Sequence, residues 1–215
     1  MTPLLHPELI NDPFGDPGVY VDFLHERRAL LLDLGDLGAM SPRKLLRVTH
    51  AFVSHTHMDH FCGFDRLLRV LLGRSKRIHV TGPAGFVGKL EHKLAAYSWN
   101  LAGESAADLC IDAHELAADD RMQTTRFCFS TGFSGEALPG RSLTGGVILD
   151  EANLTVRAVQ LDHRIPCLAF SVEEKSHFNV WRNEVVNMGL GVGPWLRDLK
   201  QAVMRGDPDD TAITA

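Results

Sequence analysis

The chain has 215 residues, of which 45% are hydrophobic and 23% charged, an ordinary composition for a globular protein. That length suits one large domain or two small ones. The net charge of -5 argues against a generally basic nucleic-acid-binding protein, although a local basic patch can still attract a polyanion. We find no run of about 20 apolar residues and no secretory leader, so we expect no membrane span and no signal peptide.

The four cysteines, Cys62, Cys110, Cys128 and Cys167, are widely spaced and none forms a CxxC pair. This spacing predicts neither a disulfide framework nor a zinc ribbon. Reduced thiols are typical of the cytoplasm, so we expect a cytoplasmic protein.

Hydrophobic periodicity and turn residues predict strands and helices in alternation. Strands are expected at 19–24, 29–34, within 45–54, at 77–82, within 103–145 (including 126–133) and, as successive strands with a turn at 151–153, within 145–174. Helices are expected from Phe64 to a stop at Gly73, and at 86–101, 178–188 and 194–205. This order favours a layered α/β fold over a helical bundle or a pure β-sandwich.

Four potential metal ligands lie at the end of the strand within 45–54: His55, His57, Asp59 and His60. Imidazole and carboxylate together suit Zn²⁺, and Mn²⁺ or Fe²⁺ share these ligands. In an extended segment the side chains of His55 and His57 point the same way and can reach one ion. Asp59 and His60 lie at the turn into the next helix and can reach a second ion. Asp59 is therefore both a candidate ligand and the candidate catalytic proton acceptor for a metal-bound water.

The pattern H-x-H-x-D-H after a buried strand resembles the signature of the metallo-β-lactamase superfamily. The resemblance implies an αβ/βα sandwich with two metal ions at one edge of the sheets. The stretch Leu30–Asp36 is similar to the superfamily's earlier strand, which ends in an aspartate turn. On that match Asp33 is a structural residue that braces the loop carrying His55, His57, Asp59 and His60, called the metal loop below.

The stretch Leu161–Lys175, "LDHRIPCLAFSVEEK", is similar to the ribonuclease Z group, the endonucleases that process tRNA 3′ ends. In this group a histidine before such a strand is a metal ligand. The resemblance therefore implies that His163 completes the first metal site with His55 and His57.

A second stretch, Met188–Asp207, resembles the exosite of ribonuclease Z, which grips the body of tRNA. Gly193 and Pro194 match its glycine-proline motif and are the implied substrate-binding residues. Basic side chains nearby are candidates for phosphate contacts: Lys175, Arg182, Arg197, Lys200 and Arg205.

The chain departs from the ribonuclease Z pattern in two places. "INDPFGDPGVYVDF" replaces the group's glycine-rich loop, and the group's late aspartate and histidine ligands have no clear counterpart. The late candidates are His177, Asp207, Asp209 and Asp210, of which the three aspartates are expected to form an exposed turn. We therefore expect an α/β fold incomplete at its C-terminal side, with a metallo-β-lactamase-fold region at 1–175, an exosite-like helical segment at 176–207 and a tail at 208–215.

Three functions are consistent with these features. The leading one is a ribonuclease Z-like phosphodiesterase that cleaves RNA at the tRNA 3′ end with a water activated by two zinc ions. Steering of RNA would then depend on patches such as Arg66–Arg77. The second is a hydrolase of the same fold that acts on a small ester, thioester, lactam or phosphodiester. The third is a non-catalytic metal-binding fragment with exposed apolar surface. The resemblance also implies a homodimer.

Overall fold

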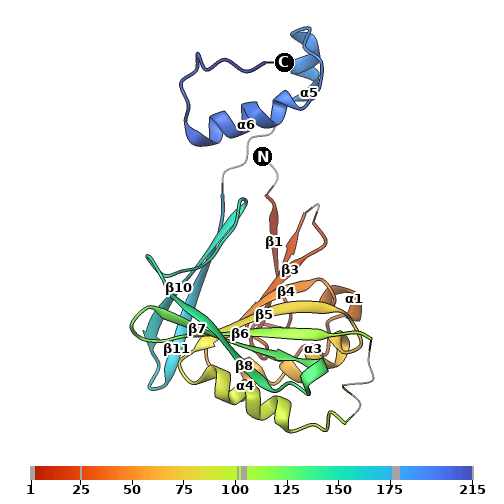
Figure 1. The fold of residues 1–215 in the computed structure, drawn as a ribbon, viewed down its shortest axis with the longest axis vertical. Helices are drawn as coiled ribbons and strands as arrows, with labels where there is room; N and C mark the ends of the chain where they lie inside the picture. The colour runs from red at the N-terminus through yellow and green to blue at the C-terminus, as the bar shows by residue number, and fades with distance from the viewer. Residues whose placement is uncertain (1–2, 25, 101, 103–105, 176–179, 215) are drawn as a thin grey trace.

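The computed structural model describes residues 3–24, 26–100, 102, 106–175 and 180–214. Within these residues the chain forms two sheets and a set of helices (Figure 1). The helices α1 (Pro42–Leu45), α3 (Phe64–Leu71) and α4 (Phe86–Ala95) cover one face of the larger sheet, and the smaller sheet packs on its other face. The predicted alternation of strands and helices is confirmed.

The larger sheet has eight strands in chain order within the described residues. Its middle strands β3 to β6 are parallel, and antiparallel strands flank them on both sides. The strands are β1 (Leu5–Leu9), β2 (Val19–Phe23), β3 (Ala29–Leu32), β4 (Val48–Phe52), β5 (Lys76–Pro83), β6 (Leu109–Leu116), β7 (Arg121–Cys128) and β8 (Gly135–Ser142).

The smaller sheet is antiparallel and, in the described part of the chain, has three strands in the order β11-β10-β9. Its strands are β9 (Val147–Asp150), β10 (Leu154–Asp162) and β11 (Pro166–Glu174). Alternate residues of β10 face the larger sheet and are buried, among them Leu154, Val156 and Ala158. Val159 and Leu161 face the other way, with exposed fractions of 58% and 50%. The outer face of this sheet therefore presents apolar side chains to solvent.

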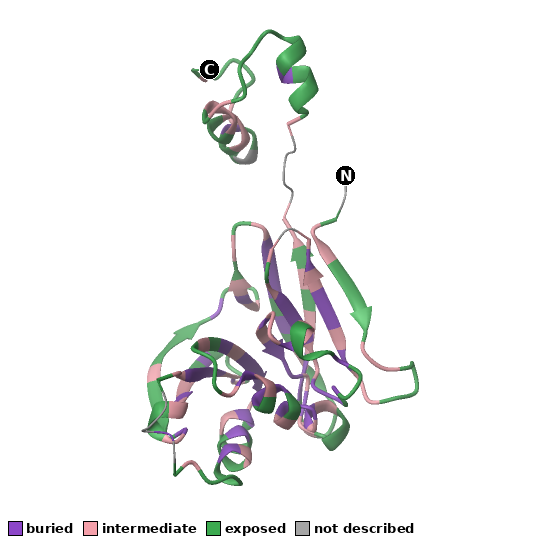
Figure 2. Cartoon of the chain, turned by 90° about the vertical axis from the view of Figure 1, so that its right-hand side faces the viewer, coloured by how far each residue is buried: buried purple, intermediate pink, exposed green. Residues whose placement is uncertain are grey.

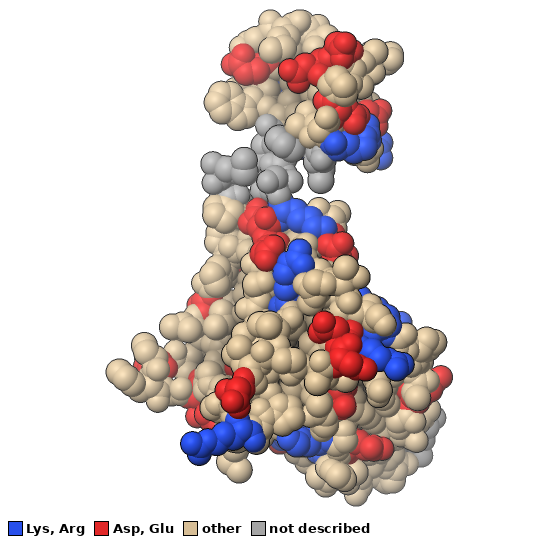
Figure 3. All heavy atoms as spheres, turned by 90° about the vertical axis from the view of Figure 1, so that its left-hand side faces the viewer, with Lys and Arg blue, Asp and Glu red and all other residues tan. Residues whose placement is uncertain are grey.

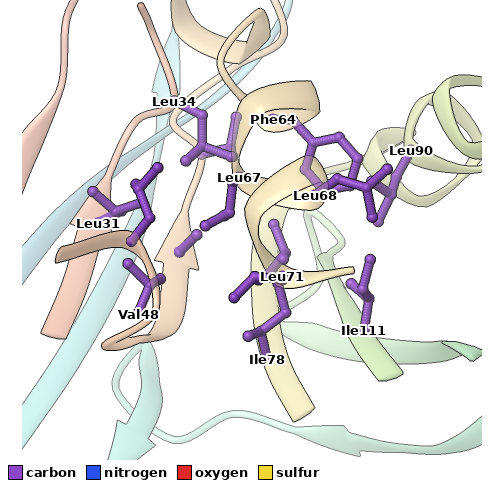
Figure 4. Packing of buried hydrophobic residues seen from close by; sticks show 14 of the residues in the cluster. Leu31, Leu34, Val48, Phe64, Leu67, Leu68, Leu71, Ile78, Leu90 and Ile111 are labelled. Carbon is purple, nitrogen blue, oxygen red and sulfur yellow. The ribbon is translucent and has the colours of Figure 1, made fainter. Parts of the chain in front are cut away.

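The crossover helices between the parallel strands bury one apolar face each. They are α1 (Pro42–Leu45), α2 (Met58–Phe61), α3 (Phe64–Leu71) and α4 (Phe86–Ala95). Ser41 caps α1 by accepting a hydrogen bond from the Lys44 N–H, and Pro42 suits the first turn. In α3, Phe64, Leu67, Leu68 and Leu71 recur at helical spacing and pack against the sheet (Figure 4). Each fully buried side chain of this kind stabilises the fold by about 1.5–3 kcal/mol.

Two helices follow the smaller sheet: α5 (Arg182–Asn187) and α6 (Trp195–Arg205). They lie away from both sheets and are largely exposed (Figure 2). Pro194 precedes α6 and Gly206 ends it in the left-handed conformation, as its position after the last periodic residue predicts. No helix among the described residues is long and apolar enough to cross a membrane.

Several element boundaries differ from the sequence predictions. Helix α4 ends at Ala95 rather than at residue 101, because the Trp99 indole N–H donates to the Leu94 carbonyl and its ring packs against Phe133. Strand β7 ends at Cys128 and does not continue to residue 133, because a short 3₁₀ turn begins at Phe129. The structure also contains β1 and α1, which periodicity did not predict. The predicted start of the helix at 178 lies outside the described residues.

Cys110 and Cys128 form a disulfide between β6 and β7, where their Cα atoms lie 4.1 Å apart. The prediction from spacing alone was wrong here, because cross-strand register brings together cysteines that are 18 residues apart. Cys62 and Cys167 are free.

Candidate metal centre

The predicted cluster lies at the carboxyl end of β4, between the ends of β3 and β5. The Val53 N–H donates to the Thr81 carbonyl, which extends the pairing of β4 and β5 up to the cluster. His57 precedes α2 in an extended conformation. Nε2 of His55 and Nδ1 of His57 face each other at 3.1 Å. The two rings therefore converge as the spacing of the motif predicts.

His163 reaches the same point from the smaller sheet. It lies in the hairpin between β10 and β11, and this hairpin is anchored where the Leu168 N–H donates to the Ser54 carbonyl at 2.8 Å. Ligand nitrogens of His55, His57 and His163 all lie within 4.8 Å of one another. His57 and His163 also line an open depression of about 530 Å³. The trio is thus buried on one side and accessible on the other.

Asp33 connects the end of β3 to this cluster. Its carboxylate accepts hydrogen bonds from the Ser54 N–H at 2.7 Å and the Ser54 hydroxyl at 2.9 Å. Nδ1 of His60 lies 2.9 Å from the same carboxylate. An N–H at Nδ1 leaves Nε2 of His60 as a free acceptor, the tautomer that a metal ligand needs. The geometry of Asp33 agrees with the predicted bracing role.

Asp59 is exposed and lies in the first turn of α2. Its Oδ2 is 3.5 Å from Nε2 of His60. Asp59 and His60 therefore present one oxygen and one nitrogen side by side, next to the imidazole trio.

Burial lowers the pKa of His55, and the neighbouring imidazoles of His60, His57 and His163 lower it further. A lowered pKa favours the neutral imidazole, which is the form that binds a metal ion. Three imidazole nitrogens at this separation fit one Zn²⁺, whose structural and catalytic sites use histidine nitrogen at about 2.0–2.1 Å.

The exosite-like residues are remote from this cluster. Gly193 and Pro194 lie between α5 and α6, away from the sheet edge that carries the histidines (Figure 1). Two of the five predicted phosphate contacts already have carboxylate partners: Lys175 with Asp150 at 2.6 Å and Arg205 with Asp207 at 2.6 Å. Arg182 and Arg197 are exposed and Lys200 is half-buried.

The late ligand candidates are not part of the cluster either. Asp207 pairs with Arg205, and Asp209 and Asp210 are exposed in a turn. His177 lies outside the described residues. Within the described residues, three of the predicted ligands, His55, His57 and His163, come within 4.8 Å of one another. Asp59 and His60 lie beside each other at 3.5 Å, and Asp33 contacts His60.

The basic stretch Arg66–Arg77 does not surround the cluster. Lys76 begins β5, whose opposite end lies beside the metal loop, and its ammonium donates to the Leu46 carbonyl at 2.5 Å. Figure 3 shows Lys and Arg interspersed with Asp and Glu over one face of the molecule rather than gathered into a continuous basic surface. A role of this stretch in steering RNA stays a prediction.

Lys89 is a residue near the cluster that the sequence motifs did not indicate. It lies on the first turns of α4, and its ammonium donates a hydrogen bond to the hydroxyl of Thr56, which stands between His55 and His57. The one signal in the sequence is its position three residues after Phe86, at the start of the helix that follows the next parallel strand.

Comparison with known proteins gives consistent relatives, although no family model matches the chain. It is 33% identical to ribonuclease Z of Deinococcus radiodurans over 92% of its own length and 60% of the relative's. It is 23% identical to ribonuclease Z of Pyrococcus abyssi over 82% of its length and 49% of the relative's. Among solved structures, the short form of human tRNase Z superposes with a TM-score of 0.50 at 24% identity, over 80% of this chain and 64% of that one. The chain thus spans about half to 60% of these curated relatives.

Proposed function

Because the chain is a ribonuclease Z-like member of the metallo-β-lactamase superfamily with that superfamily's α/β fold, we propose that it carries the metal-binding part of a phosphodiesterase that cleaves RNA at the 3′ end of tRNA precursors. Its relatives are named ribonuclease Z, and the chain matches them over most of its own length. Because it spans only part of theirs, activity and substrate are part of the proposal.

The observation that carries the proposal is the convergence of three imidazoles from two different sheets. His55 and His57 follow β4, and His163 comes from the hairpin of the smaller sheet. Such a set of imidazole nitrogens beside an open depression suits a catalytic metal site, in which at least one coordination position is left for water.

We assign each residue a role in this site. His55, His57 and His163 hold the first ion, and Asp59 and His60 contribute to the second. A bound Zn²⁺, or Mn²⁺ or Fe²⁺ in its place, would polarise the phosphodiester and lower the pKa of its water to near neutrality. Asp59, exposed at the rim, would accept the proton of the attacking water. Asp33 orients His60 through the hydrogen bond at Nδ1.

The remaining parts of the proposal concern partners. Gly193 and Pro194 would contact the tRNA body, and the exposed cations Arg182 and Arg197 would contribute phosphate contacts. A homodimer and a cytoplasmic location remain predictions.

A hydrolase of a small ester, thioester, lactam or phosphodiester is the second candidate. The acidic loop between β1 and β2 favours it, because Asp12 and Asp16 line a separate depression together with Asp36 and repel a polyanion on that side. A panel of small chromogenic substrates, assayed beside a labelled tRNA precursor, separates the two functions.

A non-catalytic metal-binding fragment is the third candidate. Two residues, Asp59 and His60, serve the second ion in the described part of the chain, and Val159 and Leu161 are exposed on the outer sheet face. An exposed apolar surface of this kind promotes self-association.

The first experiment is elemental analysis of the purified 215-residue chain, together with His163→Gln and a control, His92→Gln, at an exposed position on α4. Two ions per chain in the wild type, with loss in His163→Gln alone, support a binuclear site, and cleavage of a tRNA precursor should then be measured on this chain. One ion per chain in the wild type, again lost in His163→Gln, supports the hypothesis of a non-catalytic metal-binding fragment. Metal content that is unchanged in His163→Gln would overturn the ligand assignment.

A further inference from the structure

The disulfide between β6 and β7 has a carboxylate beside it. Cys110 and Cys128 face each other in the antiparallel pair, with their Cα atoms 4.1 Å apart. Asp108 precedes Cys110 by two residues, a spacing that puts both side chains on one face of an extended segment. Sγ of Cys110 lies 3.7 Å from Oδ2 of Asp108. The two sulfurs and a carboxylate oxygen of Asp108 all lie within 4.8 Å of one another. Opening the S–S bond would therefore leave two thiols and a carboxylate directed to one point.

Ser130 holds the Asp108 carboxylate in position. Oδ1 of Asp108 accepts a hydrogen bond from the Ser130 N–H at 2.9 Å, and Oδ2 accepts one from the Ser130 hydroxyl at 2.8 Å. Ser130 lies in the 3₁₀ turn that follows β7, so the carboxylate is tied to the strand end that carries Cys128. Hydrogen bonds of this kind orient a ligating carboxylate, whose two oxygens keep further lone pairs for an ion.

Two arginines near the cysteines are engaged by a different carboxylate. Arg126, two residues before Cys128, binds Asp112 through Nε at 2.7 Å and through a second guanidinium nitrogen at 2.9 Å. Arg77 is the β5 partner of Cys110 in register, and its Nε lies 3.9 Å from the same carboxylate. Positive charge in this position favours the thiolate form of a nearby cysteine. Neither arginine has an ion pair with Asp108 among the contacts of the described residues.

The three side chains lie at the opposite edge of the larger sheet from the metal loop. Strands β4, β5 and β6 run parallel, and His55 follows the end of β4, whereas Asp108 and Cys110 stand at the start of β6. Cys110 is buried and Cys128 is half-buried, so a small reductant has access to the S–S bond through Cys128. The histidine cluster therefore does not share these ligands.

We propose that Asp108, Cys110 and Cys128 form a second, redox-gated metal site, which binds a thiophilic divalent cation such as Zn²⁺ once the disulfide is reduced. Thiolate sulfur binds Zn²⁺ at about 2.3 Å and carboxylate oxygen at about 2.0–2.2 Å, and three protein ligands leave one tetrahedral position for water. The inference goes beyond the proposed function and does not depend on it, because it requires neither RNA nor the histidine cluster.

A dithiol reductant opens the site. One thiolate of the reductant attacks Sγ of Cys128, the S–S bond breaks, and Cys110 leaves as a thiolate. The second thiol of the reductant attacks the mixed disulfide, which frees Cys128 and oxidises the reductant to its own disulfide. Two electrons and two protons thus pass to the chain, and the incoming cation displaces the two protons from the thiols. A disulfide oxidant reverses the step: it is reduced to two thiols, the Cys110–Cys128 bond forms again, and the ion is released.

The test uses Co²⁺ as the probe and the full chain, prepared without metal. Thiolate ligands give Co²⁺ a charge-transfer band in the near ultraviolet that imidazole and carboxylate ligands do not give, so ions at the histidine cluster do not contribute. The wild type is titrated either oxidised or reduced with dithiothreitol and desalted under nitrogen. Equilibrium dialysis counts the bound ions, and thermal unfolding checks that each variant folds.

The variants are Cys110→Ser, Cys128→Ser and Asp108→Asn, with Cys62→Ser as a matched control because Cys62 is a free thiol elsewhere in the fold. Asp108→Asn keeps an oxygen that can accept from the Ser130 N–H but removes the charge. The comparison of oxidised with reduced wild type needs no variant and therefore stands even if a variant does not fold.

We expect the reduced wild type to show the band and to bind one Co²⁺ per chain more than the oxidised wild type, which should show no band. The reduced Cys110→Ser and Cys128→Ser variants should lose the band, and Cys62→Ser should keep it. Asp108→Asn should weaken Co²⁺ binding at the sulfurs by about 10-fold or more, since even the loss of a group that only orients a ligand costs that much.

Three results would each overturn the site. The reduced wild type could show no band and no additional ion. The band could persist in both serine variants, which would assign it to Cys62 or Cys167. Asp108→Asn could bind Co²⁺ as tightly as the wild type, which would remove the carboxylate from the set of ligands.

Discussion

A row of three histidines should make the fold sensitive to acid. His50, His79 and His114 lie on the neighbouring strands β4, β5 and β6, on the face that looks toward the smaller sheet. The rings of His50 and His79 stack with centroids 4.7 Å apart, and those of His79 and His114 at 5.3 Å. Burial lowers the pKa of His50 from 6.5 to about 3 and that of His114 to about 4, and the neighbouring imidazoles contribute.

The sign of the effect follows from these pKa values. Above pH 6.5 both the folded and unfolded chains hold His50 neutral, so its full contribution to stability is present. Below pH 6.5 the unfolded chain binds a proton that the folded chain rejects, and the free energy of unfolding falls until the pH reaches about 3. One such group adds up to about 1.4 kcal/mol per pH unit. The whole interval corresponds to about 5 kcal/mol, an upper limit because water entering between the sheets would raise the folded pKa.

The assay is urea unfolding of the metal-free chain in EDTA between pH 8 and 4, on the wild type and on His50→Gln. We expect the wild type to lose more stability than His50→Gln as the pH falls below about 6.5. His92→Gln on α4 is the matched control, since His92 is exposed, and it should follow the wild type. The four metal-site histidines are present in all three proteins, so their effect cancels in the difference. Parallel curves for wild type and His50→Gln would refute the reasoning that burial keeps His50 neutral.

Three further outcomes are expected. Gly63→Ala should lower the free energy of unfolding by about 3 kcal/mol or more in a urea titration, because its Cβ would lie 2.0 Å from the Gly35 carbonyl oxygen, a backbone atom that cannot give way. Asp33→Asn should weaken zinc binding by about 10- to 100-fold in competition with a chelator, because the brace on the metal loop is lost. Without reductant, Cys110→Ser should lower the free energy of unfolding by about 3 kcal/mol, because the 18-residue loop between Cys110 and Cys128 is no longer closed. With reductant, the variant and the wild type should be equally stable.

Each of these has a control or a contradicting outcome. Gly88→Ala on α4 has no atom within 4 Å of its new Cβ and should be neutral or stabilising, so equal losses at both glycines would argue against a steric cause. Asp198→Asn, at an exposed position on α6, should leave zinc affinity unchanged. If the stability difference between Cys110→Ser and the wild type is the same with and without reductant, the disulfide does not form.

The sequence alone determined the features that depend on near neighbours in the chain. The spacing of His55, His57, Asp59 and His60 defines a chelating pattern because an extended segment and the following turn bring these side chains to one point. The period of α3 and its end before Gly73 are likewise readable, since an apolar face and a left-handed glycine are local properties. The alternation of strands and helices follows from the same local rules.

The tertiary structure decided everything that depends on register between distant segments. His163 joins the cluster because the hairpin of the smaller sheet is bonded to Ser54, more than 100 residues earlier. The Cys110–Cys128 disulfide and the row of His50, His79 and His114 arise from pairing between strands. Hydrophobic periodicity carries no information on which strand lies beside which, or at what offset. For His163 the sequence offered only the resemblance to the ribonuclease Z group. The disulfide and the row of histidines become visible only once the strands have paired.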